Sequence, residues 1–279
     1  MKLGFHVSIV DSLDQSFDRA RQLGCSVFQI FTRNPRTWRS KPLDEAIIEA
    51  FRWKHRTYGI GSVFSHMPYL PNLASPDETI YRKSVDSLIE EVERCHLLGI
   101  RFVVTHMGSH VGSGAERGKA RIIQALYRAI EHDGPVILLE NGSGSGNHLG
   151  SHLEEVAEIL ATVGGSRVGS CFDTCHAYGA GYDVATKEGL AQTLRIIRKT
   201  IGFDKLMLVH LNDSYGDLSS GIDHHAHIGL GKIGEEGFRN ILASQLARRP
   251  MVMETPIDDR RCDADNMDKV IELAGLSRQ

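Results

Sequence analysis

Short apolar runs recur along the chain every few tens of residues, and longer segments with apolar positions at helical spacing separate them. We predict strands at Leu3 to Val7, Val27 to Phe31, Val63 to Ser65, Phe102 to Thr105, Val136 to Leu139, Val168 to Phe172, Leu206 to Leu211 and Met251 to Met253. The predicted helices are Leu13 to Leu23, Leu43 to Tyr58, Asp77 to Leu98, Glu116 to Glu131, Leu153 to Val163, Lys187 to Ile201, Glu235 to Leu246 and about Arg260 to Leu273. Eight strand–helix units favour an α/β fold whose parallel sheet closes into one (β/α)8 TIM barrel, a single domain over residues 1–279.

Six of the apolar runs are followed directly by a histidine or a carboxylate. In a parallel α/β barrel the carboxyl ends of the strands surround the active site. Because six runs place residues that bind metals at the same structural position, we predict one cavity that holds more than one metal ion. The six residues are His66, His106, Glu140, Asp173, His210 and Glu254.

The longest predicted loops follow strands and would crowd the same rim of the barrel. They are Thr32 to Pro42, Met67 to Pro76, Met107 to Ala115, Asn141 to His152 and Asn212 to Gly234. The formal net charge of −3 gives no global basic field, although a local positive surface would suffice for nucleic acid. Five scattered cysteines without a CxxC pair, and an amino terminus without an apolar signal segment, predict a cytoplasmic enzyme with reduced thiols and no membrane contact. We expect a monomer.

Two further segments add ligand types to this rim. Asp173 and His176 stand three residues apart just after a predicted strand, and residues 223–227 read Asp-His-His-Ala-His. Zinc favours nitrogen and oxygen ligands of this kind. The second segment alone could be an ordinary polar loop, but together with the strand ends it supports a metal site.

Several strings resemble the endonuclease IV family, the apurinic/apyrimidinic endonucleases of DNA base-excision repair. The resemblance follows the chain in order through Tyr69-Leu70-Pro71-Asn72-Leu73, His106-Met107-Gly108-Ser109-His110, Glu140-Asn141, Asp173-Thr174-Cys175-His176, His210-Leu211-Asn212-Asp213-Ser214 and Asp223-His224-His225. It implies a xylose-isomerase-like TIM barrel that hydrolyses the phosphodiester on the 5′ side of an abasic site in double-stranded DNA. The products would be a 3′-hydroxyl and a 5′-deoxyribose phosphate.

The resemblance also implies three zinc ions and catalytic roles for Glu140, Glu254 and His176. The first zinc would be held by His66, His106 and Glu140, the second by Glu140, Asp173, His210 and Glu254, and the third by His176, Asp223 and His225. Three positions depart from the family pattern. Pro35, in the rim loop after Asn34, stands where other members can have glutamine. His224 stands where the family usually has arginine, and Ser145 stands where it tends to have glutamine.

The rim loops carry candidate DNA contacts. The loop after the second strand contains Asn34 and four cations, namely Arg33, Arg36, Arg39 and Lys41, which could neutralise phosphates. Tyr69 and Leu70 could form a wedge that enters the duplex. The alternatives are an ordinary solvated loop and ordinary loop packing. For the whole chain, the alternative function is a metal-dependent sugar isomerase or epimerase on the same barrel.

Overall fold

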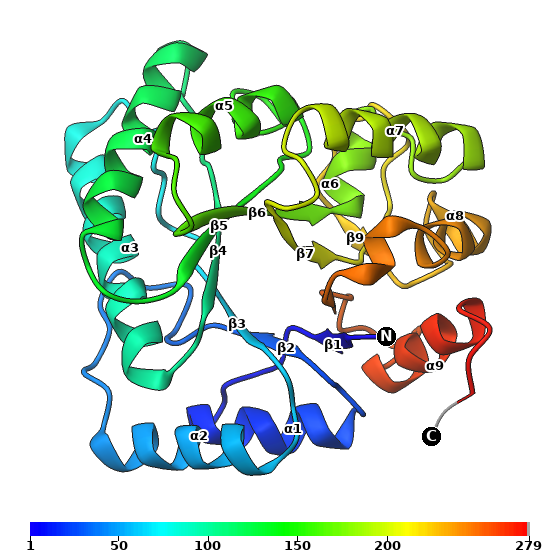
Figure 1. Cartoon of the computed structure of the whole chain (residues 1–279), viewed down its shortest axis with the longest axis horizontal. Coiled ribbons are helices and arrows are strands. Elements are labelled where there is room, and N and C mark those ends of the chain that lie inside the picture. Colours follow the sequence, from blue (N-terminus) through cyan, green and yellow to red (C-terminus); the bar gives the residue numbers. More distant parts are fainter. Residues whose placement is uncertain (278–279) are drawn as a thin grey trace.

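Eight parallel strands form a barrel in the computed structural model, which describes residues 1–277 (Figure 1). Their hydrogen-bonded order is β1-β10-β7-β6-β5-β4-β3-β2. Parallel pairing of His6 with Gln29 closes the ring between the first and last strands of this order. The strands are β1 (Leu3–Phe5), β2 (Phe28–Ile30), β3 (Val63–His66), β4 (Phe102–His106), β5 (Val136–Glu140), β6 (Val168–Asp173), β7 (Leu206–His210) and β10 (Met251–Met253).

Helices surround this sheet, as the alternation of the sequence predicts (Figure 1). They are α1 (Ser16–Gln22), α2 (Glu45–Thr57), α3 (Glu78–Leu98), α4 (Ala115–Ile130), α5 (Leu153–Val163), α7 (Lys187–Lys199), α8 (Gly234–Leu242) and α9 (Asp263–Leu273). Asp77 begins α3 by accepting a hydrogen bond from Ile80 N, and Gly99 ends it in the left-handed conformation. Across residues 1–277, none of the helices combines the length and the apolar character that a membrane span requires.

The strands separate two apolar cores. A small core fills the barrel and consists of Val27, Phe64, Val104, Leu138, Cys171, Leu208 and Val252. A larger core lies between the outer faces of the strands and the helices, with fully buried side chains such as Phe17, Phe51 and Phe238. Because side chains alternate along a strand, the residue two positions after each interior residue lies on the same inner face.

Short elements that the sequence pattern did not predict lie on the rim. The helix α6 (Thr174–Gly179) follows β6 directly, and Asp173 caps it by accepting from His176 N at 2.8 Å. A small antiparallel hairpin of β8 (Asp213–Ser214) and β9 (His225–Ala226) lies within the long loop after β7.

Two helix boundaries were predicted wrongly. The predicted helix Leu13 to Leu23 opens with a 3-10 turn, η1 (Leu13–Gln15). The predicted helix Glu235 to Leu246 ends at Leu242, because Ser244 starts a separate 3-10 turn, η2 (Gln245–Arg248), by accepting from Leu246 N at 3.1 Å.

Candidate metal centre

A layer of polar side chains covers the barrel core at the carboxyl ends of the strands. Each member stands two residues after a position on the inner face, so it faces the barrel axis above that core. His66 follows Phe64 in this way, and Glu140 follows Leu138. The layer comprises one residue per strand, namely His6, Gln29, His66, His106, Glu140, Asp173, His210 and Glu254.

The nine ligands that the resemblance implies lie together in three groups. Within each group the potential ligand atoms all lie within 4.8 Å of one another. The first group is His66, His106 and Glu140, the second is Glu140, Asp173, His210 and Glu254, and the third is His176, Asp223 and His225. A further combination, Asp173 with Cys175 and His225, satisfies the same distance limit.

Glu140 is the residue that two groups share. Its Oε2 lies 3.1 Å from His66 Nε2 and 3.7 Å from His106 Nδ1, on the side of the first group. Its Oε1 lies 2.9 Å from His210 Nδ1, on the side of the second group. The carboxylate is fully buried, so its two oxygens face two different sets of imidazoles and have the arrangement of a bridging ligand.

Four of the histidines have one ring nitrogen occupied by an oxygen that can only accept. One proton is therefore held on that nitrogen, and the other ring nitrogen faces the carboxylates, where a metal ion could replace the proton it carries in the metal-free site. The bonds are His66 Nδ1 to Met67 O at 2.7 Å, His176 Nδ1 to Asn141 O at 3.0 Å, His225 Nδ1 to Glu254 O at 3.0 Å and His210 Nε2 to Gln29 Oε1 at 2.9 Å.

The third group contains a buried nitrogen that has no hydrogen-bond partner and that a cation would satisfy. His225 Nε2 is buried without a hydrogen-bond partner, 3.7 Å from Asp173 Oδ2 and 3.8 Å from Asp223 Oδ1. His176 Nε2 lies 3.0 Å from the same oxygen of Asp223. A metal ion would satisfy the unpartnered nitrogen and draw these donors together, so the residues present fit a metal.

The charges of the cluster depend on one another. Burial favours the neutral form of Glu140, but the imidazoles of His106 and His210 hold its pKa well below the usual range. Burial likewise opposes the charged form of His176, yet the carboxylates of Asp173 and Asp223 raise its pKa well above the usual value. Imidazole protons therefore neutralise the carboxylates, and a bound metal would take the place of those protons.

The site contains amides and an imidazole that were not among the predicted site residues. Gln29 and His6 contact Glu254 from one side. Asn212 donates to Asp173 Oδ2 at 2.6 Å and accepts from Glu254 N at 2.8 Å. Asn141 accepts from Asp173 N at 2.8 Å. The two-residue spacing after each interior position is the sequence signal that would have identified His6 and Gln29.

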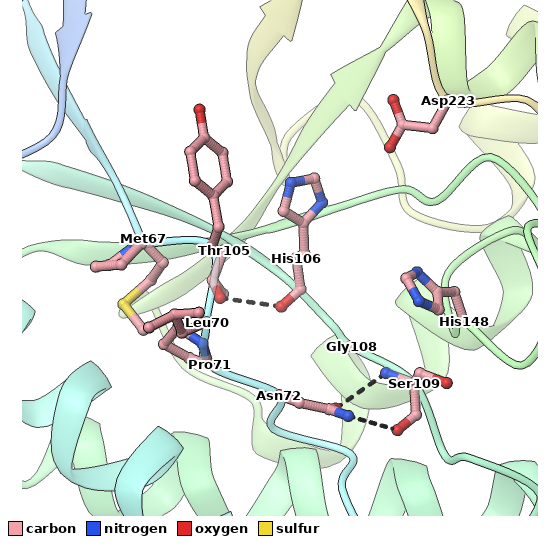
Figure 2. A pocket seen from close by; sticks show the side chains of 12 residues that line it. Met67, Leu70, Pro71, Asn72, Thr105, His106, Gly108, Ser109, His148 and Asp223 are labelled. Atoms are coloured by element: carbon pink, nitrogen blue, oxygen red, sulfur yellow. Dashed lines mark hydrogen bonds between the residues drawn. The ribbon is translucent and has the colours of Figure 1, made fainter. Parts of the chain in front are cut away.

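An open cavity of about 380 Å³ lies above the three groups, with Phe31, Tyr69 and Thr255 on its wall. A neighbouring pocket of about 280 Å³ extends from His106 and Asp223 to Leu70 and His148. Figure 2 shows His106, His148 and Asp223 around this second opening, with Asn72 beside it. The metal groups are thus reached from a shallow depression on the rim.

Hydrogen bonds between loops fix the shape of this rim. The Asn72 side chain accepts from Ser109 N and donates to Ser109 O, both at 2.9 Å (Figure 2). Gly108 permits this approach, because its φ is +90° and a Cβ atom there would lie 2.3 Å from Asn72 Oδ1. Tyr69 N donates to Pro35 O at 3.1 Å and so joins the loops after β2 and β3.

The candidate DNA contacts lie at the edge of the depression. Tyr69 is 62% exposed and Leu70 is 39% exposed, although both are apolar in large part. The Tyr69 ring packs edge-on against Phe31, with centroids 5.2 Å apart. Asn34 and Arg36 are exposed, and Asn34 Oδ1 accepts from Arg36 N at 3.0 Å, which shapes the turn. These residues are therefore available to a ligand.

Arg33 is the exception among the four cations of this loop. It is only 5% exposed and donates to Glu90 Oε2 at 2.9 Å and to Trp38 O at 3.2 Å. The prediction that Arg33 faces phosphates is therefore wrong. Its guanidinium links the loop to α3. The charge of Glu90 and the backbone oxygens around it compensate the cost of burying the guanidinium.

Two of the departures from the family pattern, His224 and Ser145, lie on exposed positions of the rim, and Pro35 is half-buried. The ring of His224 packs against Tyr215, with centroids 4.6 Å apart, and Arg260 lies 5.1 Å from the centre of the Tyr215 ring. Ser145 is exposed within the glycine-rich loop after β5. Neither substitution removes a member of the three metal groups.

Residues 17–276 match the family model described as xylose isomerase-like TIM barrel. The chain is 50% identical to the probable endonuclease 4 of Methanoculleus marisnigri, over 98% of this chain and 99% of that protein. The solved structure of endonuclease IV from Thermus thermophilus superposes with a TM-score of 0.88 at 38% identity, covering 99% of both chains. A D-tagatose 3-epimerase-like protein, with a TM-score of 0.72, coverage of 99% and 98%, and 21% identity, shares the fold alone.

The fold thus places the chain among the xylose isomerase-like TIM barrels, and its clustered ligand residues fit metal ions. Within that class the chain belongs to the endonuclease IV family, and it is a phosphodiester-cleaving hydrolase.

Proposed function

We propose that the protein is a zinc-dependent endonuclease that cleaves double-stranded DNA on the 5′ side of an abasic site. The observation that carries this proposal is the arrangement of nine ligand residues in three adjacent groups, two of which share Glu140. The open cavity above them and the exposed Tyr69 and Leu70 on its rim support a large, shaped substrate. The third group supports a nuclease over an epimerase, because epimerases of this fold need only one or two metals.

Bound zinc ions would supply Lewis acidity and lower the pKa of water at the scissile phosphate. Glu140 would be a ligand in both of the first two groups, and Asp173, His210 and Glu254 would complete the second. His176, with Asp223 and His225, would hold the third ion beside the site of the scissile phosphate. These side chains are the catalytic set that we propose.

The rim residues would provide recognition. Tyr69 and Leu70 would enter the stack where a base is missing, and a sugar without a base leaves the helix at small cost. Asn34 and Arg36 would contact the backbone beside them. Selectivity would then arise because the depression over the metal groups admits the abasic sugar and excludes an intact nucleotide.

Two measurements test this proposal. Elemental analysis of the zinc-loaded protein should give about three metals per chain, and at most one would overturn the three-metal centre. A duplex with a single tetrahydrofuran abasic analogue should be nicked once, leaving an end that a DNA polymerase extends. An intact duplex of the same sequence is the control, and equal cleavage of both duplexes would contradict the proposed specificity.

A further inference from the structure

Gln29 lies at the seam where the barrel closes, and its side chain is fully buried beneath the metal groups. Its amide nitrogen donates to Glu254 Oε1 at 2.8 Å, and its amide oxygen lies 2.9 Å from His210 Nε2. Its nitrogen also lies 3.0 Å from His6 Nδ1. One side chain thus contacts two members of the second metal group.

These contacts fix the orientation of the amide and of the imidazole. A carboxylate can only accept, so the amide nitrogen of Gln29 must face Glu254 and its oxygen must face His210. His210 therefore keeps a proton on Nε2. Its Nδ1 then faces Glu140 Oε1 at 2.9 Å and Glu254 Oε2 at 3.4 Å, which is the side where a metal would bind.

His210 differs from the other histidines held in this way. The fixed nitrogens of His66, His176 and His225 contact backbone carbonyl oxygens, which any sequence with this fold would supply. The fixed nitrogen of His210 contacts a side chain instead. Its orientation therefore depends on the identity of residue 29.

We propose that Gln29 is a positioning residue that prepares His210 and Glu254 to bind the same metal ion. It holds the tautomer of one ligand and the carboxylate orientation of the other, while Asn212 holds Glu254 from the opposite side. Because Gln29 is buried, it acts through these ligands and does not touch DNA. The inference rests on the proposed metal centre.

The test compares Gln29→Met, which keeps the volume and removes both hydrogen bonds, with Gln29→Glu, which keeps a polar side chain and removes the donor to Glu254. Thr193→Val is the matched control, because it removes a buried hydrogen bond of 3.0 Å from α7 to Asp183 O, away from the strand ends. Zinc affinity is measured by competition with a chelator, and the cobalt-loaded proteins are compared by visible absorption.

Both Gln29 variants should bind the ion of the second group about 10- to 100-fold less tightly, the usual effect of losing a partner of a metal ligand. Their cobalt spectra should change, and kcat should fall with KM for abasic DNA nearly unchanged. Thr193→Val should lower Tm without these effects. If the Gln29→Met variant does not fold, the zinc affinity and cobalt spectrum of the Gln29→Glu variant alone test the inference.

Unchanged zinc affinity and an unchanged cobalt spectrum in a folded Gln29 variant would overturn the inference. A parent protein that binds no metal would instead overturn the proposed function, so the two failures are distinguishable.

Discussion

The first two metal groups and the third group are built by different parts of the fold. The first two come from the ends of β3 to β7 and β10, and Glu140 and His210 are at most 1% exposed, although the side chain of His106 is 45% exposed. The third takes Asp223 from a loop and His225 from the hairpin, and the side chain of Asp223 is 50% exposed. Strand ends therefore fix one part of the centre, and rim contacts fix the other.

This difference indicates that substitution of a ligand has different consequences in the two parts of the centre. A ligand at a strand end is held by the barrel itself, whose packing changes little when one polar side chain is replaced. The third group depends on the packing of its hairpin, where Asp213 accepts from the backbone nitrogens of Gly229, Gly231 and Ile233 at 2.9–3.0 Å. Removing a third-group ligand should therefore leave the other two groups in place.

The largest effect is expected at a strand end. Glu254→Gln should lower cleavage by more than about 100-fold, because it removes a negative charge from the second metal group. Losing a residue that only orients a metal ligand typically costs about 10- to 100-fold. The fold should survive, since Glu254 lies at the surface of the polar layer and not in an apolar core. Single-turnover kinetics measure the cleavage rate, and circular dichroism checks that the variant is folded. A cleavage rate within tenfold of the parent would contradict the prediction.

A chelator titration should separate the two parts of the centre. We expect one metal to leave first from the third group, because its Asp223 and His225 lie on a loop and a hairpin and not at strand ends, and the remaining two to leave later. Asp223→Asn should eliminate that first phase and leave about two metals bound. If the variant instead loses all metals together, the three groups bind metal as one unit, and the proposed independence of the third group is wrong.

The strand-end part of the centre could be predicted almost completely from the sequence, because alternation along a strand fixes which residues share a face. His6 and Gln29 were missed for a physical reason. The observed strands end at Phe5 and Ile30, so these residues lie at or near strand ends, whereas the apolar runs around them continue to Val7 and Phe31.

The loop ligands could be recognised from their clustered residue types, but their assignment to a third group came only through the family resemblance. The helix α6 has six residues and the strands β8 and β9 have two each, which is too short for a periodic signal. Their conformation depends on caps and on contacts between distant segments, as at Asp173 and Asp213. The burial of Arg33 was missed for the same reason, since its partner Glu90 lies on a helix 57 residues away.

The wedge on the rim is expected to have an intermediate effect. Tyr69→Ala should weaken binding to abasic duplex by about 1–3 kcal/mol, the range for losing one stacked aromatic side chain. Leu70→Ala should reduce discrimination between abasic and intact DNA in the same direction. Zinc content should stay unchanged, because neither side chain belongs to a metal group. Unchanged binding by both variants would show that the loop only packs against the barrel.

The smallest effect is expected from the exposed cations of the loop after β2. Arg36 and Arg39 are exposed, unlike Arg33, so we expect the Arg36→Ala/Arg39→Ala double variant to lose up to two phosphate contacts. Each contact contributes about −0.9 to the slope of log affinity against log salt, so the slope should become shallower by up to about two units. Arg195→Ala, an exposed cation on the outer helix α7, is the matched control and should leave the slope unchanged. An equal slope in the double variant and the parent would mean that this loop does not meet the DNA backbone, and recognition would then depend on the loops after β3, β4 and β5.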